Sequence, residues 1–119
     1  MVIRFATRIR YNTKMQEYYV YILANGKKGT LYVGMARNLA KRIAKHKNGS
    51  GSDFVVKYNV LKLVYFKKYE SKEEAALRER QLKHWRREWK IKLIEKNNPE
   101  WKDLFNTLSK SSGSSVAKP

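Results

Sequence analysis

The 119-residue sequence contains no cysteine, two histidines, two prolines and only ten acidic residues. Without cysteine the chain can form neither a disulfide framework nor a thiolate metal site, and two histidines alone make a poor zinc cage. No stretch approaches the length of apolar chain that a membrane span needs, and no short apolar run follows a basic N-terminus. The composition excludes structural zinc and a cysteine nucleophile, and it predicts a soluble, unexported protein of the cytoplasm.

The scarcity of acidic residues leaves a large basic excess. Lysine and arginine total 27 against ten acidic residues, a formal net charge of +17. Such a charge repels itself in the free protein and favours a polyanionic partner, first nucleic acid and second an anionic membrane surface. The helix expected over 38–47 has only Leu39 and Ile43 as large apolar residues, which is a thin face for membrane binding. Nucleic acid is therefore the favoured partner.

The length and composition indicate one domain with two polar ends. With 42% hydrophobic residues, the chain can build one modest core. Residues 1–16 are rich in arginine and contain no acid, so we interpret them as a basic N-terminal arm, although a transit peptide has a similar composition. Residues 109–119 are small and polar, which predicts a flexible C-terminal tail. The folded domain is expected over 17–108.

Aromatic and β-branched runs predict a β-hairpin at the start of this domain. Residues 18–23 form such a run, a glycine-containing turn follows, and residues 30–34 resume the pattern. The spacing of apolar residues becomes helical after Asn38, which predicts a short helix that ends at the Asn-Gly pair 48–49. Residues 61–66 then have the composition of a third strand.

Helical signals dominate the second half of the domain. Residues 71–74 form a capping box ahead of a long helix, with a break expected near Trp89. Asn98, followed by proline, predicts a further helix with Asn98 as its N-cap. The order β-β-α-β-α-α indicates an α+β domain in which helices flank a small three-stranded antiparallel sheet.

A set of chemically useful side chains is spread over these elements. Tyr21 and Tyr32 lie on the two strands of the hairpin, so the two phenols can approach each other on the sheet. Arg42 and His46 are four residues apart and share one face of the first helix. With Glu79 on the long helix, these groups can bind a phosphodiester and a divalent cation. A two-metal site needs several carboxylates close together, and the sequence has no Asp-x-Asp pair. A one-metal site is therefore favoured over a two-metal site.

The chain around this set is uniformly basic. Residues 18–52 contain seven cations and no acid. A positive field of this kind steers nucleic acid and makes its binding strongly salt-dependent. Besides Arg42, the predicted nucleic-acid contacts are Lys27, Lys28, Arg37, Lys41, Lys45 and Lys47.

The same residues resemble the motifs of the GIY-YIG endonuclease superfamily, in particular its compact single-domain members. The resemblance runs from about residue 18 to residue 104 and rests on five features in the expected order. These are Tyr19-Val20-Tyr21, Tyr32-Val33-Gly34, the pair Arg42 and His46, the helical segment 76–83 and Asn98-Pro99-Glu100-Trp101.

The resemblance implies a metal-dependent endonuclease that hydrolyses a phosphodiester bond, in DNA rather than RNA, and leaves 5′-phosphate and 3′-hydroxyl ends. Tyr32 would take the proton from the attacking water, and Tyr21 would orient the hydrogen-bond network. Arg42 would stabilise charge on the scissile phosphate. His46 would assist by hydrogen bonding or proton transfer.

The resemblance also makes Glu79 the sole protein ligand of Mg²⁺ or Mn²⁺, and Asn98 a late polar residue near the site. Each has a simpler interpretation, because Glu79 can pair with neighbouring cations and Asn98 can serve as a helix cap. A second functional class therefore stays open: a non-catalytic, basic nucleic-acid-binding module with the same fold.

Overall fold

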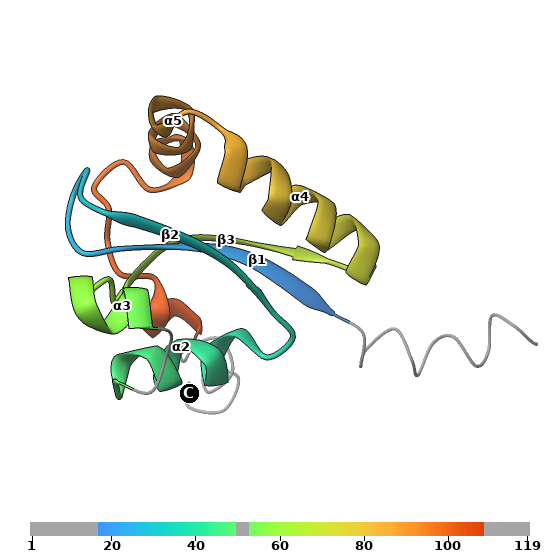
Figure 1. The fold of residues 1–119 in the computed structure, drawn as a ribbon, viewed down its shortest axis with the longest axis horizontal. Helices are drawn as coiled ribbons and strands as arrows, with labels where there is room; N and C mark the ends of the chain where they lie inside the picture. Colours follow the sequence, from blue (N-terminus) through green and yellow to red (C-terminus); the bar gives the residue numbers. More distant parts are fainter. Residues whose placement is uncertain (1–16, 50–52, 109–119) are drawn as a thin grey trace, which may run out of the picture.

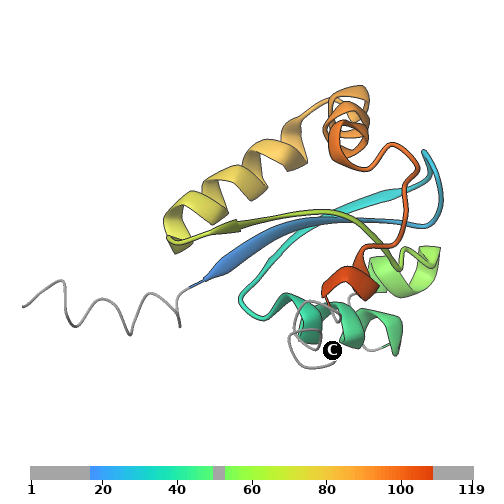
Figure 2. The same ribbon diagram turned by 180° about the vertical axis from the view of Figure 1, so that it is seen from behind.

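The structure, a computed structural model, describes residues 17–49 and 53–108. In chain order its elements are β1 (Tyr18–Ala24), β2 (Leu31–Ala36), α2 (Leu39–Lys47), α3 (Asp53–Tyr58), β3 (Lys62–Tyr69), α4 (Lys72–His84) and α5 (Arg87–Asn97). The antiparallel sheet has the order β2-β1-β3 and lies between two helical layers (Figure 1). Figure 2 shows the same layers from behind, with α4 and α5 on one face and α2 and α3 on the other.

This architecture confirms the α+β class and the three-stranded antiparallel sheet with flanking helices. The predicted N-terminal arm over 1–16 and C-terminal tail over 109–119 lie outside the described residues. Within the part of the chain that the structure describes, no helix has the length and apolar character needed to cross a membrane.

Strand β1 is the central strand of the sheet and is buried on both faces. It pairs with β2 along one edge and with β3 along the other. Successive side chains of a strand point to opposite faces. Val20 and Ile22 therefore pack in the core under α4 and α5, whereas Tyr21 and Leu23 pack in a second core with residues of α2 and α3.

Residues 25–30 join β1 to β2 in the predicted hairpin. Asn25 closes the connection, since its Oδ1 accepts a hydrogen bond from the Thr30 amide at 2.9 Å. The Gly29 amide donates to the Gly26 carbonyl at 2.9 Å, and Lys28 takes a left-handed φ of 55°. Asparagine and glycine tolerate such a turn well, which is why the sequence signals it clearly.

Helix α2 begins and ends at the predicted positions. Asn38 is its N-cap, and the Asn38 Oδ1 accepts from the Lys41 amide at 3.0 Å. Asn48 is the C-cap, and Gly49 follows with a φ of 84° that favours glycine. His46 is only 3% exposed, so α2 carries a titratable side chain into the core.

Helix α3 is not predicted by the sequence pattern. It has six residues, and its apolar side chains Phe54, Val55 and Val56 are consecutive rather than helically spaced. Val55 is fully buried in the core that contains Tyr21. Packing of this one side chain holds α3 beside α2, while Phe54 and Tyr58 remain exposed.

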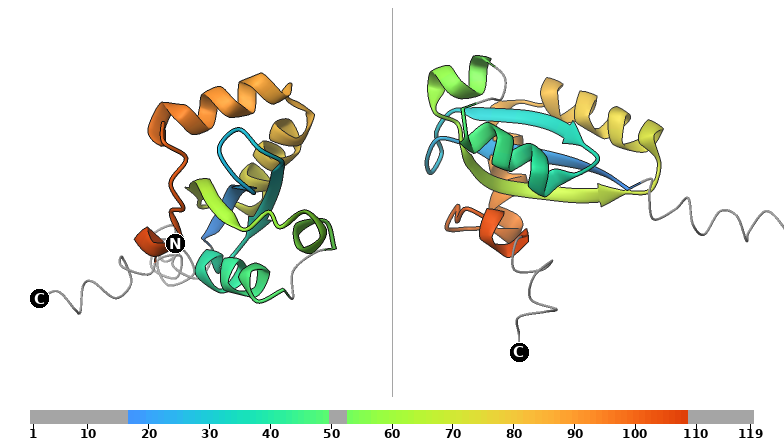
Figure 3. Two further views of the ribbon diagram at one scale, coloured as in Figure 1. Left: turned by 90° about the vertical axis from the view of Figure 1, so that its left-hand side faces the viewer. Right: turned by 90° about the horizontal axis from the view of Figure 1, so that it is seen from below.

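Helix α4 starts at the predicted capping box, with the Ser71 hydroxyl accepting from the Glu74 amide at 3.2 Å. The predicted break occurs, but at Trp85 and Arg86, both of which are extended, rather than near Trp89. Trp89 lies inside α5. Figure 3 shows α4 and α5 running in different directions over one sheet face, so packing on the shared core sets the break.

The prediction that a helix starts at Asn98 is wrong. Asn98 is the C-cap of α5. Its side-chain nitrogen Nδ2 donates to the Val64 and Lys102 carbonyls at 3.1 and 2.9 Å, and its Oδ1 accepts from the Lys102 backbone amide at 2.9 Å. Pro99 disfavours a helical conformation of the preceding residue, so Asn98 ends a helix and ties the following chain to β3.

Candidate active site

The two predicted tyrosines meet on the α2 face of the sheet. Tyr21 is paired with Gly34 across β1 and β2, and a Cβ at Gly34 would lie only 2.5 Å from the Tyr21 hydroxyl oxygen. Glycine therefore lets the Tyr21 ring lie across the edge strand. Tyr32 faces the same side, with its ring centroid 6.4 Å from that of Tyr21. Tyr21 is fully buried and Tyr32 half-buried.

His46 approaches both rings from α2. Its Nε2 lies 3.2 Å from the Tyr21 hydroxyl, and its ring centroid is 5.8 Å from that of Tyr32. The buried Nδ1 has no hydrogen-bond partner among the described residues. Burial, and then the charge of Arg42, lower the pKa of His46 from its ordinary 6.5. At neutral pH the imidazole is therefore neutral and able to accept a proton.

Tyr21 stays protonated at neutral pH. Burial is the largest influence and raises its pKa to about 12, although a hydrogen bond from Arg42 lowers it. The charges of Tyr32 and Glu79 raise the same pKa further. Tyr21 is consequently a hydrogen-bond donor rather than a base in this cluster.

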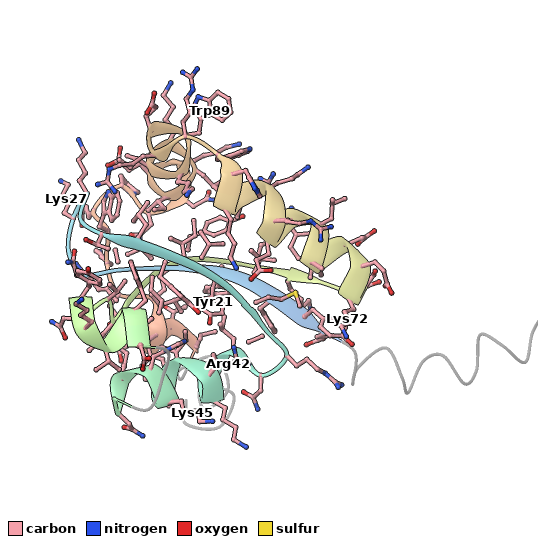
Figure 4. All side chains as sticks on the ribbon, viewed as in Figure 1. Tyr21, Lys27, Arg42, Lys45, Lys72 and Trp89 are labelled. Carbon is pink, nitrogen blue, oxygen red and sulfur yellow. The ribbon has the colours of Figure 1, made fainter. Side chains whose placement is uncertain are left out.

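Arg42 joins the cluster to a small opening at the β2 edge. Its Nη1 donates to the Met35 carbonyl at 3.2 Å, near the end of β2. Beside it lies a cavity of about 230 Å³ whose lining includes Arg37, Arg42 and Lys72. Figure 4 shows Arg42 below Tyr21, and Lys72 on the other side of the strands at the start of α4. Three cations at one opening suit a phosphate group.

Sequence reasoning missed Lys72. It directly follows the N-cap Ser71 of α4, in a segment with three acidic neighbours, Glu70, Glu73 and Glu74. That pattern indicates a helix start and nothing more. Only the packing of α4 beside β2 brings Lys72 to the opening where Arg42 lies.

Glu79 approaches from the opposite helical layer. Helix α4 packs against β1 and β2, and the Glu79 charge is close enough to Tyr21 to raise the pKa of that phenol. In this structure the Glu79 carboxylate pairs with Lys83 at 3.2 Å. No group of three or more His, Cys, Asp or Glu side chains within 17–49 and 53–108 could hold a metal. A single carboxylate still fits Mg²⁺, which keeps several of its waters when a protein binds it.

This constellation can be compared with known protein families. Residues 17–92 match the family model of the GIY-YIG catalytic domain. The chain belongs to the GIY-YIG family.

The chain is also similar to individual proteins. A UPF0213 protein of Staphylococcus saprophyticus is 40% identical over 80 residues, covering 67% of this chain and 96% of the relative. A UPF0213 protein of Clostridium perfringens is 45% identical over 76 residues, covering 64% of this chain and 81% of the relative. The solution NMR structure of a UPF0213 protein from Bacillus halodurans is 32% identical with a TM-score of 0.47, covering 73% and 92% of the two chains.

The predicted nucleic-acid contacts of this GIY-YIG domain divide by position. Lys41 and Lys45 are exposed on α2, Arg37 lines the cavity beside Arg42, and Lys27 and Lys28 are exposed on the hairpin. Figure 4 shows Lys45 near Arg42 and Lys27 at the far end of the strands. These side chains form a broad basic surface rather than one compact group.

Lys47 is placed differently from the prediction. Its Nζ donates to the Asp103 carboxylate at 2.7 Å and to the Leu61 carbonyl at 3.0 Å. Asp103 also accepts from the Leu63 and Phe105 amides at 3.1 and 3.0 Å. Lys47 therefore connects α2 to the start of β3 and to the C-terminal segment, and its charge is neutralised inside the chain.

Asn98 is likewise held away from the tyrosines. It bonds to Val64, whose side chain packs in the core on the α4 and α5 side, whereas Tyr21 packs in the other core. The structure thus brings Tyr21, Tyr32, Arg42 and His46 together, with Glu79 close enough to raise the pKa of Tyr21, but it places Asn98 in the scaffold.

Proposed function

We propose that this GIY-YIG protein is an endonuclease that hydrolyses phosphodiester bonds of nucleic acid, preferentially DNA, with the help of one divalent cation. The supporting observation is the meeting of Tyr21, Tyr32, His46 and Arg42, which come from β1, β2 and α2. These groups supply a proton donor, a second phenol, a neutral base and a cation around one small volume. That combination suits attack of water on a phosphodiester.

The roles follow from exposure and protonation. Tyr32 is the more accessible phenol and relays a proton: its oxygen takes a proton from the attacking water as its own hydroxyl proton passes to solvent. The neutral His46 beside it assists by accepting the hydrogen bond of Tyr21 at Nε2. Tyr21, protonated at neutral pH, donates its hydrogen bond and orients this network. The water oxygen bonds to phosphorus, the bond from phosphorus to the 3′-oxygen breaks, and the departing oxygen receives a proton from solvent. The products carry 5′-phosphate and 3′-hydroxyl ends.

Charge stabilisation comes from both sides of the β2 edge. Arg42 is oriented by the Met35 carbonyl and, with Lys72 at the same opening, can neutralise a phosphate. Glu79 would hold Mg²⁺ or Mn²⁺, which would supply further positive charge at the phosphate. The pair that Glu79 makes with Lys83 is no obstacle, because the Lys83 side chain is 52% exposed and such pairs contribute little.

The test compares cleavage with and without the metal ligand. The full-length protein is incubated with single-stranded, nicked, branched and duplex DNA, and with matching RNA, in Mg²⁺, Mn²⁺ or EDTA. Wild type should cleave at least one substrate in the presence of Mg²⁺ or Mn²⁺ but none in EDTA. Glu79→Gln and Arg42→Ala should lose that activity. Glu74→Gln removes the same charge from an exposed position on the same helix and should leave it intact.

The alternative function predicts a different pattern. If wild type and Glu79→Gln bind nucleic acid equally and neither cleaves any substrate, the protein is a non-catalytic binding module. The net charge of +17 supports binding under both hypotheses, so cleavage, not affinity, decides between them.

A further inference from the structure

An aromatic ladder leads from the buried Tyr21 to the protein surface. Tyr21 lies beside Tyr32 with ring centroids 6.4 Å apart, and Tyr32 stacks on Phe54 at 6.0 Å with 27° between the ring planes. Phe54 in turn contacts Tyr58 at 4.9 Å. The proposed general base, Tyr32, is therefore the second of four rings in a continuous series that ends on α3.

The two outer rings, Phe54 and Tyr58, are largely exposed and are not needed to pack α3 into the core. Phe54 is 41% exposed and Tyr58 45% exposed, while Val55 alone anchors α3 in the core. Phe54 and Tyr58 are four residues apart and so share one face of the helix. An exposed pair of large aromatic side chains next to a reactive centre is a recognisable binding feature.

One cation contacts this aromatic pair, and others lie on neighbouring elements, although Asp53 precedes Phe54 on α3. Lys57 lies over the Tyr58 ring at 5.5 Å from its centroid. The side-chain nitrogen of Asn25 donates to the Tyr58 carbonyl at 3.4 Å, which holds α3 against the hairpin that carries Lys27 and Lys28. Exposed lysines of α2 lie on the other side of the site, in a chain segment without acidic residues. The partner of the rings must therefore combine negative charge with a flat apolar face.

We propose that Phe54 and Tyr58 form a stacking platform for an unpaired nucleobase next to the scissile phosphate. The inference rests on the proposed function and narrows its substrate class to nucleic acid with at least one unpaired nucleotide at the cleavage position, such as a single strand or a flap. In a continuous duplex the faces of the bases are covered by their neighbours. An unstacked base presents a free π-face, which aromatic side chains bind irrespective of sequence.

The test uses a short single strand that carries the fluorescent base 2-aminopurine, bound by the full-length protein in EDTA so that no cleavage is needed. Stacking on an aromatic ring quenches this fluorophore. Wild type should quench it, and Phe54→Leu and Tyr58→Leu should reduce the quenching and weaken binding by roughly 5- to 150-fold. A fully paired duplex containing the same base should give little quenching with any variant.

Two controls test for general effects. Val56→Ala changes a side chain of α3 that is 48% exposed but lies off the shared face of Phe54 and Tyr58, and Trp89→Ala removes an exposed ring on the opposite helical layer. Both should quench as wild type does. A probe with one abasic position should bind wild type more weakly than an intact strand, but Phe54→Leu should bind the two alike. Because the two probes are bound by the same variant, a thermal melt that shows the variant to be folded is the only further control required.

Three results would overturn the proposal: quenching unaffected in both leucine variants, equal quenching by paired and unpaired probes, or a change only in self-association of the protein. The two proposals fail separately. If cleavage depends on Glu79 but quenching does not depend on Phe54, only the proposed stacking platform is refuted. If quenching depends on Phe54 but wild type cleaves no substrate, only the proposed nuclease activity is refuted.

Discussion

Gly34→Ala tests whether the close approach of Tyr21 to β2 organises the site. A Cβ at position 34 would lie 2.5 Å from the Tyr21 hydroxyl oxygen and 2.6 Å from Cζ, both well inside normal contact distance. The ring is rigid and fully buried, so it cannot rotate into solvent. It must shift as a unit, and this shift breaks the 3.2 Å contact with His46 Nε2.

The cost can be assembled from its parts. Overpacking of a core typically costs about 1–3 kcal/mol, and the loss of a buried hydrogen bond that leaves a group unpaired costs about 1–3 kcal/mol. Replacement of glycine inside a strand recovers about 0.5–1 kcal/mol. Gly34→Ala should therefore lower the free energy of unfolding by on the order of 3 kcal/mol.

A double-mutant cycle isolates the clash. In Tyr21→Leu the side chain ends before the positions of Cε1, Cζ and the hydroxyl, which are the three atoms that the new methyl group would meet. In that background Gly34→Ala should cost nothing. Urea unfolding of the wild type, both single variants and the double variant gives the coupling energy, expected near 3 kcal/mol.

Gly26→Ala serves as the matched control. A Cβ at Gly26 meets nothing within 4 Å, so this variant should be neutral or stabilised by about 0.4–1 kcal/mol. The reasoning would be refuted if Gly34→Ala were as harmless as Gly26→Ala, or if it cost the same with leucine as with tyrosine at position 21.

Three further predictions concern the groups around the site. Burial and the charge of Arg42 lower the pKa of His46 from 6.5, so the unfolded chain binds a proton more readily than the folded chain. The free energy of unfolding should therefore fall as the pH drops below 6.5. Thermal melts at about pH 7 and about pH 5 should show this loss of stability in wild type but not in His46→Gln. Lys47→Ala should lower the free energy of unfolding by about 1 kcal/mol, because it removes the pair with Asp103. In a binding titration it should leave nucleic-acid affinity nearly unchanged, whereas Lys45→Ala should weaken it. Equal weakening by the two variants would show that Lys47 contacts the nucleic acid. Asn98→Ala removes three hydrogen bonds and should cost about 2–4 kcal/mol in urea unfolding; a cost below 1 kcal/mol would contradict a scaffold role.

Local signals predict the elements well where residue type and backbone geometry are directly coupled. The aromatic and β-branched runs of the first strands and the caps at Asn38 and Ser71 act within a few residues, and the structure contains both strands and both caps. The break between α4 and α5, the helix α3 and the C-cap role of Asn98 escape such reasoning. In each case a contact with a distant segment decides the outcome: the shared core, the burial of Val55, or the bond to Val64.

The same division applies to the site. The order and spacing of Tyr21, Tyr32, Arg42 and His46 belong to the motifs by which the sequence resembles the GIY-YIG family, and residues 17–92 match the model of that family. Local geometry then brings these residues together, because neighbouring strands and one helical turn place them side by side. Tertiary structure alone decides that Lys47 is neutralised by Asp103, that Lys72 joins Arg42 at the β2 edge, and that Phe54 extends the ring series to the surface. The physical reason is that charge and π-contacts depend on distance through space, and a sequence records only distance along the chain.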